Sequence, residues 1–220
     1  MKNKIIAIIA LVAVIGFSMV ACSRSDKGGG SGGGSAGKAA PSSDFSYDMT
    51  VDGRGIKITG YTGNGGAVVI PATIENLPVL EIGERAFAGS SSQSRPVDAI
   101  ISIVVPNSVE VIGQGVFSNM DNLTRATLPN GLKVIPGWLF HRSAKLTSVN
   151  LPSDLEEIHA QAFVYCSELS DLKIPDSLNS VKFIPPDAFG TPNLAFAGCG
   201  KLPIATRQRL QQLGYADNFQ

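Results

Sequence analysis

Residues 146–169 read LTSVNLPSDLEEIHAQAFVYCSEL, and most of the chain is a variation on this stretch. Its proline belongs to a series in which successive members are 23 residues apart: Pro106, Pro129, Pro152 and Pro175. Apolar residues lie six, three and one positions before each of these prolines, and another lies three positions after it. Self-similarity at a period of this length is typical of a protein built from stacked repeats.

Each repeat continues with an isoleucine and, five residues later, a phenylalanine. The pairs are Ile82 and Phe87, Ile112 and Phe117, Ile135 and Phe140, Ile158 and Phe163, and Ile184 and Phe189. The segment before each proline predicts a short strand, which the proline ends because it has no N–H to donate. Stacked in register, these strands would form one parallel sheet. The part of each repeat from the isoleucine to the phenylalanine predicts turns and short helical pieces on the side opposite this sheet. When the repeats stack, the apolar side of each covers that of its neighbour, and one continuous core results.

The full pattern resembles the BspA-like, treponemal-type leucine-rich repeat family. The stretch with Pro152, Ile158, Phe163 and Cys166 carries the resemblance best, and the similarity extends over about two thirds of the chain. It implies a right-handed repeat solenoid, mostly β with short helical turns, of about five units over residues 67–202. It also implies a bacterial surface or secreted protein that binds other proteins.

Both ends of the solenoid are expected to carry caps, because an exposed terminal repeat is prone to aggregate. Residues 42–66 predict a β-hairpin whose apolar residues alternate on either side of a turn at residues 52–55. These residues are Phe45, Tyr47, Met49, Val51, Ile56 and Ile58. Residues 203–220 predict a helical cap that begins near Pro203 and ends before Gly214, with Ile204, Leu210 and Leu213 facing inward. Arg207 and Arg209 are expected at solvated positions, and Tyr215 folding back on the last turn.

The N-terminus indicates export. Lys2 and Lys4 precede an apolar run, so residues 1–21 read as a signal peptide. Ala21 followed by Cys22 resembles a lipobox, which implies cleavage after Ala21 and lipidation of Cys22. An ordinary signal peptide, or an uncleaved anchor, with an incidental cysteine is the alternative. Residues 22–41 include a glycine- and serine-rich run that predicts a flexible tether, and together these features indicate a lipid-anchored protein of the bacterial envelope, at the outer membrane or cell surface.

Composition and motifs give no indication of catalysis, of a cofactor or of a metal. Lys and Arg total 18 and Asp and Glu total 18, so nothing marks a nucleic-acid partner. The two histidines occupy repeat positions, and no nucleophile elbow or phosphate loop is present. Cys166 and Cys199 both follow a phenylalanine by three residues, which predicts buried, unpaired thiols, with a disulfide as the alternative.

Two surfaces are candidates for binding a protein. The first is the set of strand positions between the apolar ones, where Ile101 and Val104 stand at places that are polar in later repeats. The alternative is that the N-terminal cap covers them, or the inserted polar loop at residues 90–96, which makes the Phe87-to-Phe117 spacing 30 residues instead of 23. The members of this first surface are Ile101, Val104, Thr124, Arg125, Thr127, Ser148, Asn150, Asp171 and Lys173. The second comprises Trp138, His141 and Tyr165 with Arg142, a composition typical of interface hot spots. Its alternative is that Trp138 lies flat over a neighbouring turn.

These observations predict an envelope lipoprotein whose repeats bind proteins and mediate adhesion to host extracellular-matrix or other cell-surface proteins. A periplasm-facing structural or assembly lipoprotein with no host ligand is the alternative function. An enzyme acting on glycans or peptides is a third class, and it is disfavoured because function belongs to sites and no catalytic site is visible.

Overall fold

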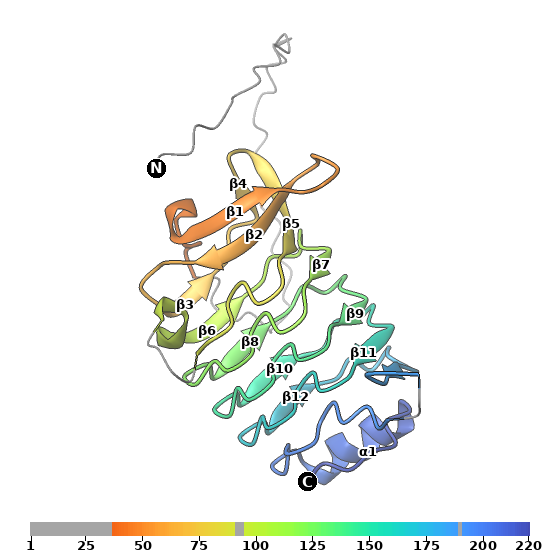
Figure 1. The fold of residues 1–220 in the computed structure, drawn as a ribbon. Coiled ribbons are helices and arrows are strands. Elements are labelled where there is room, and N and C mark those ends of the chain that lie inside the picture. The colour runs from red at the N-terminus through yellow and green to blue at the C-terminus, as the bar shows by residue number, and fades with distance from the viewer. Residues whose placement is uncertain (1–36, 91–94, 189–190) are drawn as a thin grey trace, which may run out of the picture. The chain divides into compact units, whose positions relative to one another are not determined.

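The computed structural model describes residues 37–90, 95–188 and 191–220 (Figure 1). The predicted signal peptide, Cys22 and most of the tether lie outside the described residues, as do part of the inserted loop and Phe189. Gly37–Gln220 forms one compact unit. None of the helices in the described ranges has the length and apolar character needed to cross a membrane.

The strands before the prolines form the predicted parallel sheet. It contains β3 (Gly66–Val69), β6 (Ile100–Val104), β8 (Arg125–Thr127), β10 (Ser148–Asn150) and β12 (Asp171–Lys173), which lie side by side in this order (Figure 1). All neighbouring pairs are parallel, and the register places Ala126 beside Ile103 and Val149 beside Ala126. Equivalent apolar residues of successive repeats are therefore in direct contact, as the 23-residue period requires.

The opposite side of the repeats is more extended than expected. Short strands lie there instead of helical pieces: β5 (Leu77–Ile82), β7 (Val111–Ile112), β9 (Val134–Ile135), β11 (Glu157–His159) and β13 (Lys182–Ile184). In the described residues β5 pairs with β7, and β9, β11 and β13 pair together, but β7 does not pair with β9. Gly113 donates its N–H to Ile82 O at 2.8 Å, whereas Pro136, at the same position one repeat later, has no N–H to give to Ile112.

A ladder of phenylalanine rings occupies the centre of the stack. Neighbouring ring centroids are 5.0–5.6 Å apart along the series Phe87, Phe117, Phe140, Phe163 and Phe196, and all these rings are buried. The pairing of Ile184 with Phe189 as the last repeat is wrong. The register aligns Phe183, not Ile184, with Ile158, and Phe196 is the ring that stacks on Phe163, because the connection in this repeat is longer than the regular period.

The N-terminal cap is the predicted hairpin. Its strands are β1 (Phe45–Met49), which follows a 3-10 turn at Ser42–Asp44, and β2 (Ile56–Tyr61). They pair antiparallel, and β2 extends the sheet of β5, which β4 (Thr73–Ile74) flanks on its other edge. Phe45 and Tyr61 contact Phe87 at centroid distances of 6.3 and 5.6 Å and so close the ladder. Met49 and Val51 are exposed, so the apolar alternation does not face the core near the hairpin turn.

The C-terminal cap is the helix α1 (Ile204–Gln212) and the segment after it. Leu210 and Leu213 are buried as expected, but Ile204 is 74% exposed and does not belong to the inward face. Tyr215 folds back: its N–H donates to Leu210 O at 3.0 Å, and its ring lies 5.3 Å from that of Phe196. The two arginines are not simply solvated, because Arg207 donates to Leu202 O and Arg209 to Leu178 O.

Candidate functional site

The main sheet exposes an apolar patch at β6 and β8. Ile101 is 53% exposed and Val104 37% exposed, so no described part of the inserted loop or cap covers them. Val104 lies beside Thr127 in the register, and the exposed Arg125 lies beside Ser102. We call Ile101, Val104, Arg125 and Thr127 the sheet patch.

Other predicted residues of this face hold the repeats together. Thr124 Oγ1 donates to Ile101 O at 2.9 Å. Asn150 Oδ1 accepts from Leu128 N at 3.0 Å, and Asn150 Nδ2 donates to Leu128 O at 3.2 Å. The side chain thus binds the backbone of the residue that follows β8. Ser148 Oγ donates to Asp171 Oδ2 at 2.8 Å. These polar groups already have intramolecular partners, as does Lys173 in its ion pair with Asp171 at 4.0 Å, so a ligand would find them less available than the exposed Arg125.

The second predicted surface lies on the turns that carry the phenylalanines. Each turn places a residue in the left-handed region two positions before its phenylalanine, and every turn except that of Phe87 places another two positions after it. Those before are Arg85, Gly115, Trp138, Gln161 and Leu194, and those after are Asn119, Arg142, Tyr165 and Gly198. Trp138 donates from Nε1 to Gln161 Oε1 at 2.9 Å and is 39% exposed, so it lies against the next turn and still presents part of its ring to solvent.

His141, Arg142 and Tyr165 come together beside Trp138. The His141 and Tyr165 rings are 6.2 Å apart in an edge-to-face arrangement, and the Arg142 guanidinium lies 5.7 Å from the Tyr165 ring centroid. Burial lowers the pKa of His141 below its usual value, and the charge of Arg142 lowers this pKa further. His141 is therefore neutral at pH 7, and its buried Nδ1 has no hydrogen-bond partner in the part of the chain that the structure describes.

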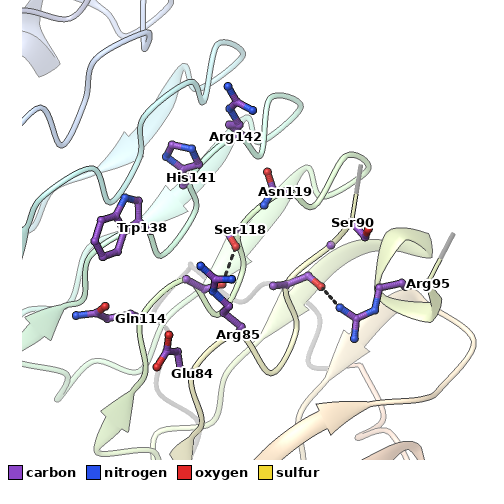
Figure 2. A pocket seen from close by; sticks show the side chains of 13 residues that line it. Glu84, Arg85, Ser90, Arg95, Gln114, Ser118, Asn119, Trp138, His141 and Arg142 are labelled. Carbon is purple, nitrogen blue, oxygen red and sulfur yellow. Dashed lines mark hydrogen bonds between the residues drawn. The ribbon is translucent and has the colours of Figure 1, made fainter. Parts of the chain in front are cut away.

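A hollow of about 620 Å³ opens next to Trp138 and His141. Its charged lining side chains are Glu84, Arg85, Arg95 and Arg142 (Figure 2). We call it the arginine hollow; its other lining residues are Ala88, Gly89, Ser90, Gln114, Gly115, Ser118, Asn119, Trp138 and His141. Sequence reasoning missed Arg85 and Arg95. The available signal was that Arg85 precedes its phenylalanine by two residues, as Trp138 does, and so occupies the same edge of the stack.

The cysteines have a structural role. Cys166 and Cys199 are free and buried, which confirms the prediction of unpaired packing residues, and they donate to Phe140 O and Phe163 O, each at 3.1 Å. Burial raises the pKa of Cys199 to about 12 and raises that of Cys166 well above its usual value. A thiol in this state is not a nucleophile at neutral pH. Among the described residues, no cluster of three or more His, Cys, Asp or Glu side chains could hold a metal ion.

The parallel sheet, the repeat period and the buried ladder define a leucine-rich repeat solenoid. The family described as "BspA type Leucine rich repeat region" matches residues 81–197 in 6 copies, and the chain belongs to this family. Proteins of this family are typically bacterial cell-surface proteins, and leucine-rich repeats generally serve as binding scaffolds rather than as enzymes. None of the curated proteins matches the chain.

Solved structures of bacterial repeat proteins share the fold. The T. pallidum leucine-rich repeat protein is 28% identical, with a TM-score of 0.53, and the match covers 83% of this chain and 99% of that one. A leucine-rich cell surface protein from Faecalibacterium prausnitzii is 21% identical, with a TM-score of 0.56, and the match covers 78% of this chain and 41% of that one. A leucine-rich repeat protein from Bacteroides capillosus is 23% identical, with a TM-score of 0.51, over 62% of this chain and 97% of that one. The last two comparisons concern the fold alone.

Proposed function

We propose that this protein is a lipid-anchored adhesin that binds proteins of host or neighbouring cells through the sheet patch. The observation that carries the proposal is the exposure of Ile101 and Val104 on the parallel sheet, next to the exposed Arg125. Burying an aliphatic side chain of this size contributes about 1.5–3 kcal/mol. Two such side chains beside an arginine provide the apolar centre and the charged neighbour that protein interfaces use.

The family and the N-terminal sequence support the envelope location. Cys22 after Ala21 provides the predicted lipid attachment, and the glycine- and serine-rich run that follows provides a tether. A lipid anchor needs two or more acyl chains to hold stably, as a diacylglyceryl cysteine would supply. Substituting Cys22→Ala should therefore move the protein from the membrane fraction to the soluble fraction, and an unchanged distribution would contradict the anchor.

The binding proposal is tested with the protein from Ser23 onward, which lacks the lipid. The immobilised protein is exposed to host extracellular-matrix proteins, and retention is compared with that of the double variant Ile101→Ser, Val104→Thr. Retention should fall at least about tenfold, the ratio expected from losing about 1.4 kcal/mol. Val111→Thr is the matched control, because Val111 is equally exposed at 53% but lies on β7, on the opposite side of the repeats.

Equal retention by the double variant and the control would overturn the sheet patch as the binding surface. Orientation is tested separately by treating intact cells with protease. Loss of the protein from cells with an intact outer membrane supports surface display. Full protection would instead favour the periplasm-facing structural lipoprotein.

A further inference from the structure

The arginine hollow is lined by more positive than negative side chains. Three guanidinium groups and one carboxylate, that of Glu84, line it. Within the described ranges no carboxylate lies within 4.0 Å of the guanidinium of Arg85, Arg95 or Arg142, although Asp98 Oδ2 accepts from the backbone N–H of Arg95 at 2.7 Å. Positive groups gathered in a concave, partly dry site raise the local potential and attract anions.

The three arginines of the hollow differ in the contacts that their guanidinium groups make within the protein. Arg95 donates from Nη1 to Ala88 O at 3.0 Å, a bond drawn in Figure 2. Arg142 stacks on the Tyr165 ring at 5.7 Å, which leaves its N–H groups available, and none of the hydrogen bonds found in the described residues uses the Arg85 guanidinium. Arg85 and Arg142 therefore have unused donors in a planar fork, the geometry that binds carboxylates in a bidentate manner.

The backbone at these two arginines is unfavourable for a side chain. Arg85 has φ 53° and Arg142 has φ 59°, in the left-handed region that favours glycine. Gly115 and Gly198 occupy the equivalent positions of other turns, so the fold accepts glycine there. Trp138, Gln161 and Tyr165 have the same backbone at equivalent positions, so the conformation belongs to the repeat and does not by itself mark a ligand site.

His141 forms part of the wall of the hollow. Its Nδ1 is buried and has no hydrogen-bond partner among the described residues, so this nitrogen is turned away from solvent. Trp138 supplies an adjacent aromatic surface, and Gln114 and Asn119 supply amide groups.

We propose that the arginine hollow binds an acidic peptide segment of a partner protein, with its carboxylates held by Arg85 and Arg142 and its backbone beside Trp138. The inference rests on the proposed function only in taking the ligand to be a protein. It assigns a second site, on the turns rather than on the sheet, and it specifies the chemistry of the segment that enters.

The chain contains a single tryptophan, Trp138, so intrinsic fluorescence reports directly on this hollow. The protein from Ser23 onward is titrated at low salt with N-acetyl-triglutamate amide. The matching triglutamine peptide and sodium sulfate serve as probes of charge and of simple anion binding. A saturable change with the glutamate peptide is expected, together with weaker binding as salt is added.

Arg85→Gln and Arg142→Gln should each weaken the binding about tenfold, the effect of losing one charge-assisted contact. Arg54→Gln, which removes one exposed cation from the hairpin turn, should leave it unchanged. Far-ultraviolet circular dichroism checks that each variant is folded. If either arginine variant does not fold, the other variant and the salt dependence decide the result.

Four results would overturn the inference: no saturable change, an equal response to triglutamine, an equal response to sulfate at the same concentration, or full binding in both arginine variants. The two proposals fail separately. If the glutamate peptide does not bind but the sheet-patch variant still loses its partner, only this inference is wrong. If the peptide binds but the sheet-patch variant retains its partner, only the proposed sheet-patch function is wrong.

Discussion

Three side chains at the same place in successive repeats fasten each turn to the one before it. Ser143 Oγ donates to Phe117 O at 2.7 Å, and the thiols of Cys166 and Cys199 donate to the carbonyl oxygens of Phe140 and Phe163. In these three repeats the position is therefore filled by a small hydrogen-bond donor. Met120, which fills it in an earlier repeat, instead donates its backbone N–H to Ser143 Oγ at 3.3 Å.

Replacing Ser143 by alanine should lower the free energy of unfolding by about 1–2 kcal/mol, because Phe117 O and Met120 N would lose a buried partner. Ser143→Cys should recover most of this loss, since cysteine makes the same bond one repeat later. Urea unfolding followed by circular dichroism measures both. Ser167→Ala, at an exposed serine, is the control and should change stability by less than about 0.5 kcal/mol. If Ser143→Cys were as unstable as Ser143→Ala, the hydrogen bond to Phe117 O would not explain why serine or cysteine occupies this position.

The two buried thiols should not react while the protein is folded. Burial raises the pKa of Cys199 to about 12, so almost none of it is thiolate at pH 8, and the same holds for Cys166. In the protein from Ser23 onward, a colorimetric thiol reagent should label both residues only after urea is added. Rapid labelling of either thiol in buffer would mean that the C-terminal repeats open far more readily than the ladder contacts suggest.

At the scale of the elements, the turns approach one another so closely that one glycine cannot be replaced. A Cβ on Gly89 would lie 1.9 Å from Asn119 O in the neighbouring turn. Gly89 also donates its N–H to Ser118 O at 2.8 Å, which fixes the spacing between these turns. The arginine hollow lies directly beside this contact.

Gly89→Ala should therefore destabilise the protein by about 1–3 kcal/mol, the usual cost of forcing extra volume into a packed contact. Gly131→Ala is the matched control, because nothing lies within 4 Å of the Cβ that would be added there. Thermal unfolding of the two variants gives the comparison. If the two variants had the same melting temperature, the turns would be able to move apart to accept the extra methyl group.

The strands of the main sheet and both caps could be predicted from the sequence because burial alone sets the apolar period, whereas the short strands of the opposite side were expected as turns and helical pieces. The break between β7 and β9 could not be read from that period, since Pro136 disturbs the backbone ladder and leaves the apolar pattern intact. The last repeat was misaligned for a related reason: Phe183 and Ile184 are both apolar, and only the register distinguishes them.

Of the two candidate sites, one could be predicted from the sequence and the other could not. The sheet patch was predictable, because strand positions between buried residues face outward. The arginine hollow was not, because Arg85 and Arg142 belong to turns of different repeats and meet only through the stacking of the turns. Asn150 was expected to be free for binding, but nothing in its sequence context revealed the two bonds of its amide to Leu128.

For the whole molecule, the aromatic ladder is continuous from one cap to the other. Tyr61 stacks on Phe87 at one end, and Tyr215 lies against Phe196 at the other. Tyr215 is almost completely buried, and its hydroxyl accepts from Phe196 N at 3.2 Å and donates to Asn218 O at 3.1 Å. Each repeat contacts only its neighbours, so the end rings determine how the stack resists opening.

Tyr215→Ala should lower the free energy of unfolding by about 3–5 kcal/mol, the range for truncating a large buried aromatic residue. Tyr215→Phe keeps the ring and should cost only about 1–2 kcal/mol, through the unpaired Phe196 N–H. Because coupling in a solenoid is between neighbours, the loss should also be directional. Amide hydrogen exchange in the alanine variant should quicken at the turns of Phe196 and Phe163 and change little at β6. A uniform increase from β6 to α1 would mean that the stack opens as one cooperative unit, and nearest-neighbour coupling would then be wrong for this protein.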